Sequence, residues 1–124
     1  MRHTTLAAVL ALLTGTAASA EDGDAARGEQ LYARCAACHA LAYDRVGPRH
    51  CGVLGRRAGT VPGFDYSPAM KRSKLVWTKE NLNRFLADPP GVVPGTTMTY
   101  AGVNDAKDRA DLVAYLGTAS CSKR

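Results

Sequence analysis

The stretch "CAACH", residues 35–39, decides how the rest of this chain is interpreted. If the stretch is helical, Cys35 and Cys38 lie on one face, because residues i and i+3 are neighbours on a helix. His39 follows directly, so two thiols and an imidazole come together within about one turn. This stretch is therefore the first candidate for a functional site.

Four interpretations compete for the motif. Two neighbouring thiols can form thioethers with the two vinyl groups of a haem while the next imidazole binds the iron, and C-x-x-C-H is the signature of that attachment. A thioredoxin-type dithiol needs a strand and a helix in a βαβ unit, which the sequence lacks. A zinc site needs four well-placed ligands, and no second paired Cys/His cluster is present. A disulfide between Cys35 and Cys38 would close a very small ring, so we predict one haem c, bound covalently through these two cysteines.

The first 20 residues have the order of a secretory signal peptide. Arg2 precedes an apolar run over residues 6–13, and the stretch ends in the small residues Ala-Ser-Ala at Ala20. The run is short for a membrane span, and an uncleaved N-terminal anchor is the alternative. We expect export to the periplasm with cleavage after Ala20, which leaves residues 21–124 as a single domain.

Composition narrows the class of protein further. The formal charge of +5 falls to +4 without the signal peptide (15 basic minus 11 acidic residues), which can bias encounters toward acidic partners. The basic residues are scattered and no basic motif interleaved with aromatics appears, so we predict no nucleic-acid binding. The whole chain has eight aromatic residues (5 Tyr, 2 Phe and 1 Trp), and a domain of this length has a marginal core. A cofactor is therefore expected to fill the interior.

Hydrophobic periodicity and capping residues predict an all-α fold with three main helices. The first is expected over residues 24–40 with Asp24 as N-cap, and the second over residues 78–88, capped by Thr78 and stopped by two prolines. The third starts at Asn104 or Asp105 and runs through Gly117. The segments between them, residues 42–70 and 91–103, are rich in Gly and Pro and are predicted to be long loops wrapped around a ligand.

A haem held by one imidazole has a second axial position. A methionine thioether is a soft ligand that stabilises reduced iron and raises the potential, and Met70 and Met98 are the two methionines outside the signal peptide. Each could instead fill a gap in the core. We favour Met98, because Pro94 and Gly95 can turn the chain across a flat face.

Four stretches of the sequence, quoted at the end of this paragraph in chain order, resemble class I cytochromes c. The resemblance is greatest to the small soluble bacterial branch, whose members resemble mitochondrial cytochrome c. The resemblance covers nearly all of residues 23–118 and implies the class I cytochrome c fold, with its long loops wrapped around one covalently bound haem. The stretches are "GDAARGEQLYARCAACH", "VGPRHCGVLGRRAGTVPGFDYS", "LVWTKENLNRFLADP" and "VPGTTMTYAGVNDAKDRADLVAYL".

The resemblance assigns roles to residues around the haem. Cys35 and Cys38 would hold it, His39 and Met98 would ligate iron, and the Pro48 carbonyl would accept the ring N–H of His39. Other positions would contact the propionates, namely Tyr66, Trp77 and Arg56 at one and Thr96 at the other. Taken singly, the aromatic side chains among them could equally be core residues. The helix crossing would involve Gly28, Tyr32, Leu112 and Tyr115, and Tyr100 would lie near the exposed haem edge.

The chain also departs from the mitochondrial pattern. Phe85 stands where those relatives place a Tyr near the methionine ligand, and Met70 replaces a common Asn. Three uncharged residues occupy positions that carry partner-facing lysines in mitochondrial proteins, namely Pro90, Gly91 and Thr97. Docking to a strongly acidic partner is correspondingly weakened.

Cys51 and Cys121 lie outside the haem motif. An exported protein with two further thiols usually pairs them, so we predict a disulfide that encloses about 70 residues. The entropic model assigns such a closure roughly 4 kcal/mol. The neighbouring His50 is expected to be exposed rather than an alternative iron ligand.

The predicted function is that of a monomeric electron carrier and not an enzyme. Iron ligated on both sides leaves no position for a substrate, whereas an exposed haem edge suits one-electron transfer. The donor would be a membrane quinol-oxidising cytochrome complex or a dehydrogenase, and the acceptor an oxidase, a reductase, a peroxidase or a photosynthetic reaction centre. The alternatives are a haem peroxidase or gas-binding sensor with an open sixth position, and a zinc module without haem.

Overall fold

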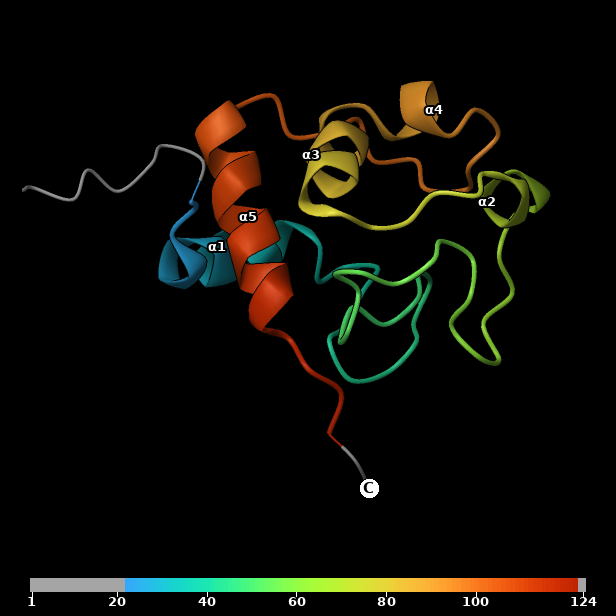
Figure 1. Cartoon of the computed structure of the whole chain (residues 1–124), viewed down its shortest axis with the longest axis horizontal. Coiled ribbons are helices and arrows are strands. Elements are labelled where there is room, and N and C mark those ends of the chain that lie inside the picture. Colours follow the sequence, from blue (N-terminus) through green and yellow to red (C-terminus); the bar gives the residue numbers. More distant parts are fainter. Residues whose placement is uncertain (1–21, 123–124) are drawn as a thin grey trace, which may run out of the picture.

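The computed structural model describes residues 22–122, so the predicted signal peptide and its cleavage point lie outside the described residues. The described chain is helical, with one isolated antiparallel bridge between Arg57 and Val76 and no strand. Long loops connect the helices (Figure 1). The elements are α1 (Ala25–Leu31), η1 (Tyr32–Arg34, a 3₁₀ turn), α2 (Pro68–Arg72), α3 (Lys79–Ala87), α4 (Pro89–Val92) and α5 (Ala106–Thr118). Within residues 22–122, no helix is both long and apolar enough to cross a membrane.

The N-caps of the three predicted helices are confirmed. The Asp24 carboxylate accepts the backbone N–H of Ala26 at 2.9 Å, and the Thr78 hydroxyl accepts that of Asn81 at 3.1 Å. Asp105, one of the two predicted starts of the last helix, accepts the N–H of Asp108 at 2.8 Å. Each cap satisfies a donor that the first turn of a helix leaves free.

The predicted helix over residues 24–40 is too long. Regular α-helix ends at Leu31, because the N–H of Cys35 bonds to the Tyr32 carbonyl three residues back, at 2.8 Å, and the chain tightens into a 3₁₀ turn. Residues 35–38 form further turns, in which the Cys35 carbonyl accepts the N–H groups of Cys38 (3.1 Å) and His39 (2.9 Å). The motif is therefore a closed turn following a helix.

Two short helices, α2 and α4, were not expected from the sequence, and they overlap the end of the predicted loop 42–70 and the start of the predicted loop 91–103, respectively. In α2 the Ser67 hydroxyl accepts the N–H of Met70, and in α4 the Asp88 carboxylate accepts the N–H of Gly91. In both helices a proline follows the cap, where its missing N–H costs no hydrogen bond. Pro89 therefore starts a helix as well as following the end of another.

Helices α1 and α5 cross in close contact (Figure 1). Gly28 makes the approach possible, because a methyl group there would overlap the Asp111 carbonyl and lie 2.8 Å from Cβ of Tyr115. Tyr32 packs edge-to-face on Tyr115 with ring centroids 5.4 Å apart. The pairing of these residues agrees with the resemblance to class I cytochromes c.

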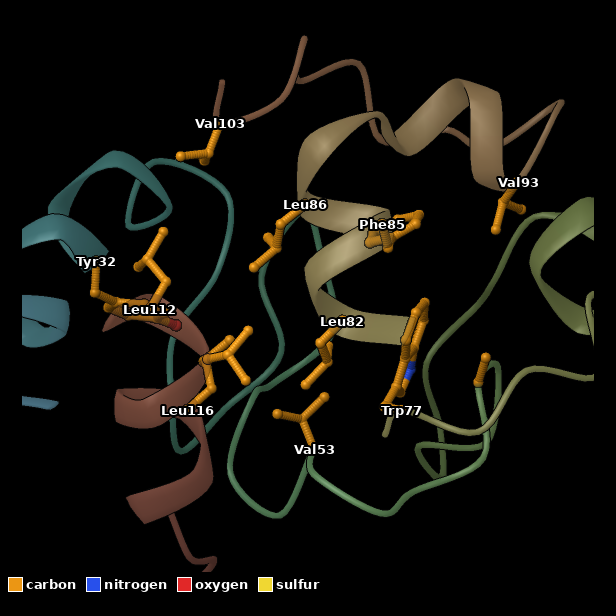
Figure 2. Packing of buried hydrophobic residues seen from close by; sticks show 12 residues of the cluster. Tyr32, Val53, Trp77, Leu82, Phe85, Leu86, Val93, Val103, Leu112 and Leu116 are labelled. Atoms are coloured by element: carbon orange, nitrogen blue, oxygen red, sulfur yellow. The ribbon is translucent and has the colours of Figure 1, made fainter. Parts of the chain in front are cut away.

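The buried apolar residues gather between α5, α3 and the loops that follow η1 (Figure 2). Leu112 and Leu116 of α5 lie on one side of the cluster, and Leu82 and Phe85 of α3 lie on another (Figure 2). Trp77, just before α3, packs against Phe85 at a centroid distance of 5.0 Å. This cluster forms one wall of the site described below.

The end of the chain is tied to the first long loop. The sulfurs of Cys51 and Cys121 are bonded, with their Cα atoms 4.8 Å apart across a separation of 70 residues. Beside them, the N–H of Gly52 donates to the Ala119 carbonyl at 2.6 Å. The segment after α5 is thereby held against residues 51–52.

Candidate haem site

A cavity of about 640 Å³ lies between the loops and helices α3 and α5. Ligand pockets span roughly 300–1,000 Å³, so this volume is that of a pocket for a small molecule or cofactor. Most of its wall is apolar, with a few polar groups interspersed. The predicted site residues that line it are Cys35, Cys38, His39, Pro48, Arg56, Tyr66, Trp77, Thr96 and Met98.

The two cysteines of CAACH line the cavity, and neither takes part in a disulfide. Cys35 is half-buried, and burial raises the pKa of its thiol. Cys38 is exposed at the surface. A ligand held by both sulfurs would thus be buried beside Cys35 and reach solvent beside Cys38.

His39 is buried and is oriented by a backbone carbonyl. Its Nδ1 lies 2.8 Å from the Pro48 oxygen, as the resemblance implied. A carbonyl only accepts, so Nδ1 carries the proton and Nε2 is free to bind a metal. Burial lowers the pKa of His39, which favours the neutral imidazole that ligates metals.

The expectation that His50 is exposed is wrong. The ring of His50 stacks on that of His39, with centroids 4.0 Å apart and planes at 21°. Its Nδ1 lies 3.0 Å from the hydroxyl oxygen of Tyr32. Burial, followed by the charges of His39 and Arg56, lowers the pKa of His50 to about 3. Sequence reasoning missed this contact because no local pattern links residues 32, 39 and 50.

Arg56 tests whether these residues fit a haem. Two of its nitrogens donate to the carbonyls of Cys51 and Arg49, each at 3.1 Å. Its Nε is buried and has no hydrogen-bond partner among the described residues. A buried donor without an acceptor is costly, and burial lowers the pKa of this guanidinium. A haem propionate would supply the acceptor, so the residues fit the group.

Three further residues contribute polar groups to the wall. The Tyr66 hydroxyl accepts the N–H of Val61 at 3.1 Å and keeps its own proton to donate. The Thr96 hydroxyl accepts the N–H of Met98 at 3.2 Å, which shapes the loop that carries this methionine. Trp77 is buried with its ring at the cavity.

Both candidate methionines line the cavity and are half-buried. Met98 lies in the loop after Gly95, whose φ of +87° is the left-handed conformation that glycine allows. Met70 lies in α2 instead. Tyr100 lines the same cavity, as do Phe85 and Thr97, two of the positions that depart from the mitochondrial pattern.

The fold and the site define a class. A small helical domain with long loops, a large apolar cavity, a C-x-x-C-H turn and a carbonyl-oriented histidine is the arrangement of a protein that holds a haem covalently.

Comparisons with known proteins agree. The family model described as cytochrome c matches residues 25–120. Cytochrome c2 from Rhodomicrobium vannielii is 41% identical over 121 residues, which cover 95% of this chain and 97% of that protein. Cytochrome c2 from Blastochloris viridis is 42% identical, with 86% of this chain and 87% of that protein covered. Among solved structures, cytochrome cH from Methylobacterium extorquens has a TM-score of 0.76 at 45% identity, covering 77% of this chain and 99% of that one.

The chain belongs to the cytochrome c family. It has the all-α class I fold and carries one c-type haem, attached covalently through a pair of cysteines. It is an electron carrier and not an enzyme.

Proposed function

We propose that the protein carries single electrons in the periplasm, exported with cleavage after Ala20, with His39 and Met98 as the axial ligands of its haem iron and Cys35 and Cys38 as the attachment points. The observation that carries the proposal is the lining of the cavity. It brings the CAACH turn and the Met98 loop, which are far apart in the sequence, to one apolar space.

The bound haem would supply an iron that cycles between the ferric and ferrous states by one electron. The chain's own residues would set the conditions for that cycle. As a thioether ligand, Met98 would favour the reduced state of the iron. The Pro48 carbonyl would accept the hydrogen bond from Nδ1–H of His39 and so leave Nε2 to bind the iron. Arg56, with Tyr66 and Trp77, would bind a propionate, and Thr96 would lie near the other. Filled axial positions leave no site for a substrate, which separates this proposal from a peroxidase or gas sensor.

The proposed partners are redox proteins of a respiratory or photosynthetic chain. The donor is a membrane cytochrome complex or a dehydrogenase, and the acceptor an oxidase, reductase, peroxidase or photosynthetic reaction centre. Two relatives are named cytochrome c2, which supports a role of this kind. The mild positive charge and the uncharged residues at Pro90, Gly91 and Thr97 favour partners that are at most moderately acidic.

The optical spectrum of the oxidised and reduced protein, expressed in cells that attach haem, tests the proposal. We expect low-spin spectra in both states and a sulfur-to-iron charge-transfer band in the oxidised state. High-spin spectra and rapid carbon monoxide binding at neutral pH would overturn the His/Met assignment.

Substitution of each methionine identifies the ligand. Met98→Ala should keep the haem attached, abolish the charge-transfer band and open the iron to carbon monoxide. Met70→Ala is the matched control, since Met70 lines the same cavity, and it should keep the band. The reverse result would assign Met70 as the ligand.

We also propose that Cys51 and Cys121 are bridged in the exported protein. The 4.8 Å separation of their Cα atoms supports this, as does the hydrogen bond from Gly52 to Ala119 beside them. Mass spectrometry under non-reducing conditions should find no free thiol once haem is attached. Two free thiols would reject the bridge.

A further inference from the structure

The backbone around His50 is tightly held for a loop. The N–H of His50 donates to the Ala40 carbonyl at 3.0 Å, and that of Cys51 to the Leu41 carbonyl at 2.8 Å. Cys51 is also bonded to Cys121. The position from which the His50 side chain projects is therefore fixed.

The ring of His50 is fixed as well. Its Nδ1 is 3.0 Å from the hydroxyl of Tyr32, and the two rings meet edge-to-face at 5.8 Å. Tyr32 is buried and packs in turn on Tyr115 of α5. A column of side chains thus leads from α5 through Tyr32 to His50.

This column ends on the face of His39. The torsion between Cβ and Cγ of a histidine has a broad energy profile, so only contacts limit the rotation of the ring. The hydrogen bond to Pro48 holds one nitrogen of the His39 ring. This single hydrogen bond does not prevent the His39 ring from rotating about the bond between Cβ and Cγ. The ring of His50 lies nearly parallel to it, with centroids 4.0 Å apart, and blocks that rotation.

We propose that His50, braced by Tyr32, is a positioning residue that fixes the plane of the His39 ring, and with it the orientation in which Nε2 meets the haem iron. The proposal rests on the proposed function only through His39 as an iron ligand, and it does not depend on Met98.

Two observables follow from the plane of His39. An axial imidazole overlaps different iron d orbitals according to its orientation, so the order and spread of the haem methyl proton resonances in the oxidised protein report the plane. The hydrogen bond from Nδ1 to a carbonyl raises the basicity of the ligand, which stabilises ferric iron. A ring that turns away from Pro48 loses part of that bond, so the midpoint potential should rise.

The test uses the haem-loaded protein and three variants. His50→Leu removes the stacked ring and should change the order of the haem methyl resonances and raise the potential. Tyr32→Phe keeps the packing but removes the hydroxyl that braces His50, so it should shift the same resonances in the same direction by a smaller amount. Tyr115→Phe is the control, because its hydroxyl makes no hydrogen bond with the described residues, and it should leave both observables unchanged.

Unchanged methyl resonances and potential in both His50→Leu and Tyr32→Phe, with circular dichroism as in the parent, would overturn the proposal. If His50→Leu does not fold, Tyr32→Phe decides alone, since it keeps every ring in place. If the oxidised parent protein lacks the sulfur-to-iron charge-transfer band, Met98 is not the ligand and the proposed function fails in that respect. The haem methyl resonances of the variants would still test whether His50 fixes the plane of the His39 ring.

Discussion

Two buried regions differ in how their polar groups find hydrogen-bond partners. One is the crossing of α1 and α5, and the other is the cavity beside the CAACH turn. At the crossing, the buried Asp111 carboxylate accepts the N–H of Asp24 at 2.7 Å and binds Lys107 at 2.9 Å and Arg27. These contacts, the backbone N–H of Asp24 first, hold the pKa of Asp111 well below its usual range. In the cavity, the buried Nε of Arg56 has no such partner among the described residues.

The difference shows which part of the interior the polypeptide completes by itself. The crossing satisfies its polar groups with protein atoms and excludes any extra atom at Gly28. The cavity has a wall of side chains but needs another molecule to fill it and to pair with Arg56. The comparison therefore predicts that the structure of the cavity depends on the bound cofactor. It predicts that the helix crossing depends instead on the volume of its side chains.

Loss of the haem should have the largest effect. Without haem, the apolar wall of the cavity of about 640 Å³ has no packing partner and the buried Nε of Arg56 has no acceptor, and we expect this loss to be comparable with the whole stability of a typical domain, about 5–15 kcal/mol. The variant with Cys35→Ser and Cys38→Ser should therefore lose fixed tertiary structure, measured by near-ultraviolet circular dichroism and limited proteolysis. A variant that remains protease-resistant without haem would show that the loops complete their own core.

Removal of the disulfide should come next. Opening the 70-residue loop in a variant with Cys51→Ser and Cys121→Ser should lower the free energy of unfolding by about 2–4 kcal/mol. Guanidinium unfolding of the haem-loaded protein measures this, with the exposed neighbour Ser122→Ala as a control that should leave the midpoint unchanged. Equal midpoints for the parent and the double variant would mean that the bridge adds no stability.

A methyl group at Gly28 should have the smallest of the three effects. Gly28→Ala forces α1 away from the Asp111 carbonyl and should lower the free energy of unfolding by about 1–3 kcal/mol, with the haem spectrum unchanged. Gly117→Ala is the matched control in α5, where the nearest atom is the flexible tip of Leu54 at 3.2 Å, and it should raise stability by up to about 1 kcal/mol. If both variants behave alike, the crossing is looser than its geometry indicates.

The sequence predicted the elements that depend on local chemistry. Caps at Asp24, Thr78 and Asp105 follow from side chains that accept N–H groups two or three residues on, and this rule acts within one turn. Helices α2 and α4 obey the same rule at Ser67 and Asp88, but they are too short to show hydrophobic periodicity. From the sequence alone, the prolines beside them indicate only the end of a helix or a turn.

The site divides in the same way. The C-x-x-C-H spacing is local and specific, so five consecutive residues are enough to predict the attachment turn. Other site residues could be predicted only because their order along the chain resembles that of class I cytochromes c. All of them line the cavity, namely Pro48, Arg56, Tyr66, Trp77 and Met98. The stacking of His50 on His39 depends on Tyr32 and on packing between distant segments. No pattern in the sequence encodes such a contact.

The contact between the end of α5 and residues 51–52 has a consequence for maturation. In an oxidising compartment the four cysteines could join in several combinations, and every complete pairing would consume both sulfurs that the cofactor needs. Among the half-oxidised forms, only the one joining Cys51 to Cys121 leaves Cys35 and Cys38 both available. A bridge between Cys51 and Cys121 would therefore leave Cys35 and Cys38 with only each other as intramolecular disulfide partners.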